Sequence, residues 1–174
     1  MRVGERHYRS IWVVGDGPTV EIIDQTKLPH AFTIVTLRSL DEAAHAIGAM
    51  LVRGAPLIGA TAAYGMCLAL ADDPSDEALE AAYARLRRTR PTAINLLWAL
   101  DDMLAAVRNR ARPERLAAAY ARAAEICDAD VETNRSIGEH GLKIIEDIAA
   151  TKPGKRVNVL THCNAGWLAT VDWG

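Results

Sequence analysis

Cysteine and net charge are both scarce in this chain of 174 residues, and each scarcity excludes a class of protein. The three cysteines are an odd number at wide spacing, which argues against a disulfide framework and a zinc site and indicates a reducing cytoplasm. The formal net charge of −2 gives no field that would attract nucleic acid or a membrane surface. No secretory signal, internal repeat or low-complexity linker is visible. The composition, 50% hydrophobic and 24% charged, is typical of a soluble globular domain.

The longest uncharged run, residues 54–71, is rich in alanine and contains Pro56, Gly59 and Gly65. Its length is close to the lower limit for a membrane-spanning helix, about 18 residues. A second apolar span and an aromatic belt are both missing, and small residues at 55, 59 and 63 would let another helix pack closely. The run is therefore predicted to be a central core helix that begins at Pro56.

Turn signals and periodicity predict a β-hairpin followed by helices. The β-prone runs 10–14 and 20–23 flank a turn at 15–18, and residues 33–37 are a third strand candidate. Ser39 and Glu42 form a capping box at the start of the first helix. The expected helices cover about 40–52, 56–72, 77–88, 91–110, 113 into the 130s with an end near Gly138–Gly141, and 142–150.

The sequence RVNVLTHCNAG, residues 156–166, is expected to be a buried strand that delivers reactive side chains into a loop. In α/β proteins, ligands bind beyond the carboxyl ends of such strands. A helix beginning at Gly166 would point its amide groups at a phosphate and would favour a thiolate at Cys163. The alternative for Cys163 is a small packing residue, which is the commoner fate of a lone cysteine. A hydrolase dyad of Cys163 with His162 is disfavoured, because adjacent residues of an extended chain point to opposite sides.

Two arginines stand directly before predicted helix starts. Arg53 precedes Gly54, Ala55 and the core helix, and a guanidinium beside unpaired helix amides is what a phosphate monoester requires. Arg90 stands before the proline that opens the fourth helix, at the end of a basic cluster. The alternative for Arg53 is an ion pair with a surface carboxylate. For the other arginines of the cluster we favour a solvated helix end over a nucleic-acid site.

Several segments, in order along almost the whole chain, resemble the family of 5-methylthioribose-1-phosphate isomerase, the aldose–ketose isomerase of methionine salvage. They are THCNAG, Val52 to Pro56 with Ile58-Gly59 and Ala62 to Gly65, Asp24-Gln25 with Leu28-Pro29, Arg90 to Ala93 with Asn95-Leu96, and Asn134 with Ile137-Gly138 and Gly141. The resemblance implies a cytoplasmic, cofactor-free homodimer that acts on a phosphorylated sugar and needs no metal. It assigns Cys163 to the catalytic step, and Arg53, Gly54, Ala55 and Arg90 to substrate binding.

The same resemblance implies an α/β fold of two parts. Residues 1–125 are expected to form a β-hairpin and a mainly helical domain. Residues 126–174 are expected to be a connecting helix and the truncated start of a Rossmann-like parallel-sheet domain. Family members are about twice as long as this chain, so an amino-terminal fragment is expected.

The family's acidic residue, an aspartate, lies beyond Gly174, so the chain alone is expected to be inactive. Trp167 and Asp172 also depart from the family pattern. Two alternatives stay open: a non-catalytic regulatory protein of the exchange-factor type, and an isomerase of a related sugar phosphate such as ribose 1,5-bisphosphate.

Overall fold

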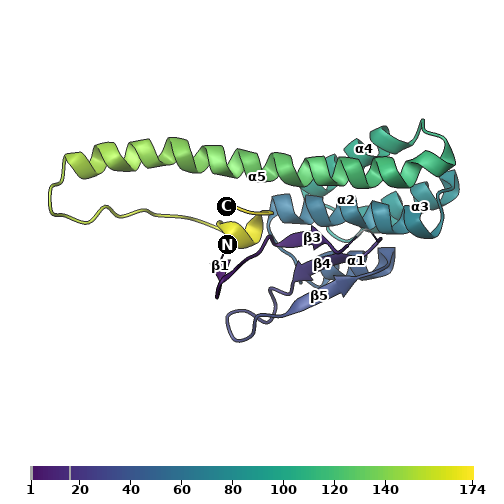
Figure 1. The fold of residues 1–174 in the computed structure, drawn as a ribbon, viewed down its shortest axis with the longest axis horizontal. Helices are drawn as coiled ribbons and strands as arrows, with labels where there is room; N and C mark the ends of the chain where they lie inside the picture. Colours follow the sequence, from purple (N-terminus) through teal and green to yellow (C-terminus); the bar gives the residue numbers. More distant parts are fainter. Residues whose placement is uncertain (1, 16) are drawn as a thin grey trace.

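Five short strands and four α-helices accompany one central apolar helix in a computed structural model of the chain, which describes residues 2–15 and 17–174 (Figure 1). An antiparallel pair opens the chain, and a three-stranded antiparallel sheet in the order β3-β4-β5 follows. The strands are β1 (Arg2–Val3), β2 (Arg6–His7), β3 (Ile11–Val13), β4 (Val20–Ile23) and β5 (Ile34–Leu37). The predicted hairpin and third strand are confirmed, whereas β1 and β2 were not predicted. Asp16, in the predicted turn, lies outside the described residues.

The register of the sheet follows the positions of its apolar side chains. Ile11 faces Ile22, and Val20 faces Val13 on one side and Leu37 on the other. Ile11, Ile22, Val20 and Leu37 are all buried, so a one-residue slip would move this set out of the core.

Helix α2 (Ala55–Asp72) is the centre of the fold. It packs against α1 (Leu40–Gly48), α3 (Asp76–Arg87), α4 (Ile94–Val107) and α5 (Arg112–Ala150). A Cβ atom at Gly59 would lie 2.9 Å from the Asn95 carbonyl oxygen, and one at Gly65 would lie 3.1 Å from Leu86. In the described part of the chain α2 is the one helix long and apolar enough to cross a membrane, but 72% of it is buried among the other helices. The prediction of a core helix is therefore confirmed.

Helix α1 begins as predicted. The Ser39 hydroxyl accepts a hydrogen bond from the Glu42 amide at 3.2 Å, and the Glu42 carboxylate accepts one from the Arg38 amide at 2.5 Å. Helix α1 ends at Gly48, earlier than predicted, and Met50 then adopts a positive φ of 59°. Helix α4 begins at Ile94 because residues 90–93 form a turn, in which the Ala93 amide donates to the Arg90 carbonyl.

The prediction of two helices separated at 138–141 is wrong, because α5 runs through these residues without a break. Helix α5 is a single helix of 39 residues, and its second half projects beyond the other helices (Figure 1). Gly138 and Gly141 do not end it, because each interior glycine costs only about 1 kcal/mol relative to alanine while the flanking residues favour a helix. The expected domain boundary at 125–126 falls inside α5, and the division into two domains stays a prediction.

The predicted strand at 156–161 is wrong for this chain, since these residues form no regular element. They belong to a segment that leaves the end of α5 and returns along it to the helical body (Figure 1). The helix predicted from Gly166 is reduced to one 3₁₀ turn, η1 (Trp167–Ala169). The physical reason is that a strand needs a neighbour for its backbone hydrogen bonds. The mixed α/β class, with a hairpin followed mainly by helices, is confirmed.

Candidate functional site

The start of α2 provides the first part of the candidate site. Gly54 is the residue before the helix, with φ 104°, and no side chain caps the helix amino terminus. The first-turn amides are therefore left for another acceptor, and the helix dipole places partial positive charge there. Arg53 stands next to this end, exposed, with no ion pair in the described part of the chain. Arg53 and the uncapped helix start are therefore neighbours, and phosphate binding by them stays a prediction.

Gly54 also marks the place where the end of the chain returns to α2. A Cβ atom at Gly54 would lie 2.3 Å from the Cα atom of Ala169, so no larger residue fits without a shift of the backbone. This contact brings η1, which follows the THCNAG sequence, against the Arg53-Gly54 segment. The residues that directly follow THCNAG are thus adjacent in space to the Arg53-Gly54 segment.

Gln25, which the sequence analysis left without a role, links the same two segments. Its side chain is buried and donates from Nε2 to the Leu168 carbonyl at 2.6 Å. Its Oε1 atom lies 3.4 Å from Arg53 Nε. The backbone amide of Gln25 also donates a hydrogen bond to the Leu51 carbonyl. Gln25 therefore orients Arg53. In the sequence, the only hint of this role was that Asp24-Gln25 is one of the segments that resemble the family.

The end of the chain is held by three further contacts. The Ser10 amide donates to the Val171 carbonyl at 2.8 Å, and the Ser10 hydroxyl donates to the Trp167 carbonyl at 3.2 Å. The Val171 amide donates to Asp130 Oδ2 at 2.7 Å. Burial raises the pKa of the Asp130 carboxyl above its usual range, against the lowering effect of its hydrogen bonds. Sequence reasoning missed Asp130 because its partner is remote in sequence.

Asp172 is buried as well and forms a second tie between the two ends of the chain. His7 Nε2 lies 2.5 Å from Asp172 Oδ2, and the Trp173 amide donates to the same carboxyl group. Burial acts to raise the pKa of Asp172, but the hydrogen bonds to its carboxylate, that of His7 foremost, outweigh it and hold the pKa below its usual range. Asp172 is therefore a structural anion.

Arg90 lies in the turn between α3 and α4. Its Nη1 atom is buried and has no hydrogen-bond partner among the described residues. A buried guanidinium nitrogen without an acceptor is costly, so this atom is suited to an incoming anion. Arg85 pairs with Asp41 at 3.1 Å, and Arg87 and Arg88 are exposed, as expected of a solvated helix end. Among the described residues, no side chain forms a hydrogen bond with both Arg90 and Arg53.

Cys163 lies in the segment between α5 and η1. It is exposed, with φ 65°, and so are its neighbours His162 and Asn164. The expected helix dipole behind the thiol is absent, because only the short turn η1 follows. Cys67 and Cys127 are buried, and burial raises the pKa of both thiols, that of Cys127 to about 12. Both are therefore packing residues of the core.

Glu132 and Arg135, three residues apart on one face of α5, form a salt bridge at 2.6 Å. Asn134 instead points inward, and its Nδ2 donates to the Asp130 carbonyl at 2.8 Å. Beside these residues and the first turns of α2 lies a cavity of about 470 Å³, lined by Pro56, Gly59, Ala60, Asn95, Trp98, Ile126, Ala129, Asp130, Thr133, Asn134 and Ile137.

Known proteins resemble the chain over its full length. It is 62% identical over 174 residues to methylthioribose-1-phosphate isomerase of Paramagnetospirillum magneticum and 58% identical over 175 aligned positions to the protein of that name from Sinorhizobium medicae. Both matches include all of this chain but 48% of the relative, so the chain spans about half the length of the curated relatives it matches.

Two solved structures share the fold. 5-Methylthioribose 1-phosphate isomerase from Pyrococcus horikoshii has a TM-score of 0.82 and 35% identity, covering 96% of this chain and 46% of that one. The translation initiation factor eIF-2B, subunit delta, from A. fulgidus has a TM-score of 0.80 and 38% identity, covering 97% and 48%. Residues 51–171 match the model of the Initiation factor 2 subunit family. The chain therefore belongs to the Initiation factor 2 subunit family.

Proposed function

We propose that this chain is the amino-terminal half of a 5-methylthioribose-1-phosphate isomerase of methionine salvage. The observation that carries the proposal is the identity of 62% along the whole chain to a relative of that name. The uncapped start of α2 beside Arg53 and the unpartnered Nη1 of Arg90 support a phosphorylated ligand.

The reaction requires that a sugar whose anomeric carbon carries phosphate be opened. The ring C1–O bond breaks as the ring oxygen takes a proton, the hydrogen on C2 moves to C1, and the C2 hydroxyl loses its proton to become a carbonyl. In the proposal Arg53, Gly54, Ala55 and Arg90 hold the phosphate, while Cys163 serves the hydrogen transfer or stabilises its transition state. Gln25 is a positioning residue for Arg53.

The proposed acid is an aspartate in the second half of the relatives, so the chain alone should bind the sugar phosphate weakly and not turn it over. The complete protein is proposed to be a cytoplasmic homodimer that requires no cofactor or metal.

An activity assay tests the proposal. The chain fused to the unmatched second half of the P. magneticum relative should isomerise 5-methylthioribose 1-phosphate, and the 174-residue chain alone should not. Cys163→Ser should nearly abolish turnover and leave substrate binding largely intact, whereas Cys127→Ala should change turnover only a few-fold.

The likeness to the eIF-2B subunit favours one other candidate, a regulatory protein that binds a phosphorylated ligand without converting it. A fused protein that binds the substrate without turnover would favour this candidate. Turnover of ribose 1,5-bisphosphate in preference to the methylthio sugar would reassign the substrate.

A further inference from the structure

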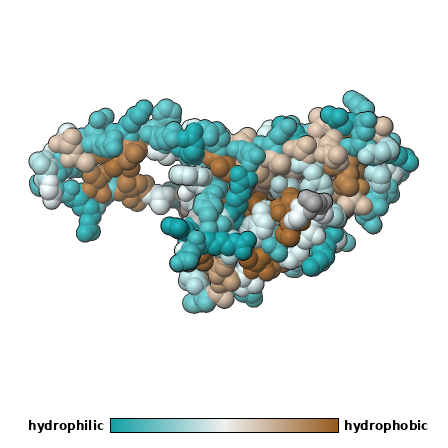
Figure 2. Space-filling view, in the orientation of Figure 1, coloured by the Kyte–Doolittle hydropathy of each residue, from teal (hydrophilic) through white to brown (hydrophobic). Residues whose placement is uncertain are grey.

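The cavity of about 470 Å³ described above lies among three helices, and we call it the three-helix cavity. Helices α2 and α4 line it with their first two turns, and α5 closes its third side. Its volume is within the range of small-molecule sites, about 300–1,000 Å³. The apolar surface on the underside of the projecting end of the molecule (Figure 2) is a separate one, because the cavity lining ends at Ile137 while α5 runs on to Ala150.

The two arginines of the proposed phosphate site stand directly before the two helices whose first turns line the cavity. Arg53 precedes Gly54, the cap residue of α2. Arg90 lies in the turn before α4, where its carbonyl accepts a hydrogen bond from the Ala93 amide at 3.0 Å. A ligand whose phosphate lies at these helix starts would therefore extend its remaining atoms along the first turns and into the cavity.

The lining of the cavity suits an apolar group. Its large side chains are Trp98, Ile126 and Ile137, and the described residues that line it include no lysine or arginine. Trp98 is 52% exposed and Ile137 is 63% exposed, so both have apolar surface that a ligand could cover. The indole ring of Trp98 is also a favourable neighbour for a thioether sulfur.

One side chain of the lining carries negative charge. Asp130 Oδ2 accepts a hydrogen bond from the Val171 amide at 2.7 Å, and Oδ1 accepts one from Asn134 Nδ2 at 3.1 Å. Both oxygens act as acceptors, as those of an ionised carboxylate do. Because no cationic side chain of the described residues pairs with Asp130, its charge would repel a phosphate group placed in the cavity.

We propose that the three-helix cavity takes the methylthio end of the sugar phosphate and excludes a phosphate from that position. The inference rests on the proposed function, in which the sugar carries phosphate on C1 and a methylthio group on C5. The helix starts and the cavity then offer an anion site and an apolar site side by side. Ribose 1,5-bisphosphate carries a second phosphate on C5, which the apolar lining and Asp130 both disfavour. Trp98 and Asp130 are thus residues that determine specificity.

Calorimetry with three sugars that differ only at C5 tests the cavity in the fused protein described above. 5-Deoxyribose 1-phosphate lacks the methylthio group and should bind about tenfold or more weakly than 5-methylthioribose 1-phosphate, since one methylene in an apolar pocket is already worth about tenfold. Ribose 1,5-bisphosphate should bind about 100-fold or more weakly, because like charges brought together cost several kcal/mol.

Two substitutions on α4 locate the apolar contact. In Trp98→Ala the methylthio and deoxy sugars should bind within about threefold of each other, because the contact with the sulfur is then gone. Ile94→Ala is the matched control, since Ile94 lies one turn earlier, is 79% exposed and does not line the cavity. It should keep the preference of the parent. A preference that survived in Trp98→Ala, or that fell equally in both variants, would overturn the proposal.

Asp130→Asn tests the exclusion of the second phosphate. The amide keeps an oxygen acceptor for Val171 but removes the charge, so the affinity ratio between the methylthio sugar and ribose 1,5-bisphosphate should fall about tenfold or more. An unchanged ratio would overturn the role of Asp130. Discrimination among the three sugars by a fused protein that isomerises none of them would support the cavity and count against the proposed function only. Turnover of the methylthio sugar with equal affinity for all three would do the reverse.

Discussion

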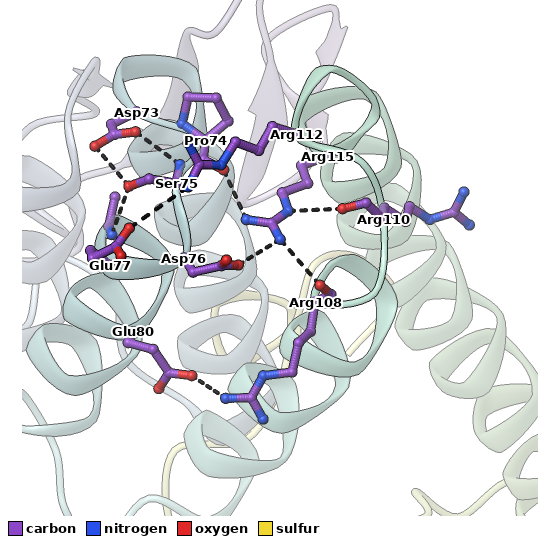
Figure 3. A network of polar contacts seen from close by, with 11 residues as sticks. Asp73, Pro74, Ser75, Asp76, Glu77, Glu80, Arg108, Arg110, Arg112 and Arg115 are labelled. Carbon is purple, nitrogen blue, oxygen red and sulfur yellow. Dashed lines mark hydrogen bonds and ion pairs between the residues drawn. The ribbon is translucent and has the colours of Figure 1, made fainter.

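Replacement of Arg115 should destabilise this chain more than replacement of any neighbouring arginine. Its side chain is 5% exposed and lies where α3, α4 and α5 approach one another (Figure 3). Nη1 donates to the Pro74 carbonyl at 2.9 Å, and Nη2 donates to Asp76 Oδ1 at 2.6 Å. Nε and Nη2 also donate to the carbonyls of Arg110 and Arg108, at 3.2 and 3.1 Å. One guanidinium thus donates hydrogen bonds to carbonyls of the segment before α3 and of the segment between α4 and α5.

The expected loss of stability follows from the acceptors that Arg115→Ala would leave without a hydrogen-bond donor. Three carbonyls would lose a charged donor, and hydrogen bonds to charged groups contribute about 1.5–3 kcal/mol each when intact. The Asp76 side chain is 64% exposed, so water can replace the hydrogen bond that its carboxylate would lose. Allowing for partial hydration of the cavity, we expect a loss of about 3–5 kcal/mol, as for breaking a buried pair. In a domain of this size that lowers Tm by about 6–20 °C.

Urea denaturation and thermal unfolding, each followed by circular dichroism, measure this loss. Arg112→Ala is the control, because Arg112 is 61% exposed and lies 3.9 Å from Glu77, an arrangement worth about 0–1 kcal/mol. Arg115→Lys should fall between the two, since one ammonium cannot reach four acceptors in the same geometry. If Arg115→Ala cost no more than Arg112→Ala, the reasoning that the guanidinium joins these segments would be wrong.

Three further predictions concern the candidate site and the end of the chain. In the fused enzyme, Arg53→Ala or Arg90→Ala should weaken substrate binding about tenfold or more by calorimetry, while Arg88→Ala should do little; unchanged affinity in both variants would remove the phosphate assignment. Iodoacetamide should label Cys163 first by peptide mass spectrometry, because burial raises the pKa of the Cys67 and Cys127 thiols and shields them; equal labelling of the three would contradict this. The pKa of Asp172 is lowered in the folded chain, so its stabilisation is present above the unfolded pKa of about 3.9 and is lost as pH falls through the folded value. The difference in free energy of unfolding between the parent and Asp172→Asn should therefore be present at neutral pH and shrink below about pH 4, and a difference that persisted at low pH would argue against the carboxylate as its source.

Local signals were sufficient for the elements whose stability is local or whose partners are close in sequence. The capping residue Ser39, the proline at the start of α2 and the turn before β4 each specify a boundary through their own backbone chemistry. The Arg53-Gly54 segment was predictable as a helix start for the same reason. The roles of Gln25 and Asp130 were not, because they depend on contacts with residues 168 and 171 that no periodicity encodes. Propensity also overestimated the effect of two glycines in α5, where a continuous run of backbone hydrogen bonds holds the helix together.

The two wrong predictions after residue 135, a helix break and a strand, have one physical explanation. A helix satisfies its backbone groups within itself, so α5 continues past the end of its packing partners even though Ile137 and Ile144 on it are exposed. A strand satisfies its backbone groups only with a neighbour, so residues 156–161 stay irregular despite their β-prone side chains. If a sheet from a second half supplied that neighbour, the strand would form and its apolar face would need a helix to cover it.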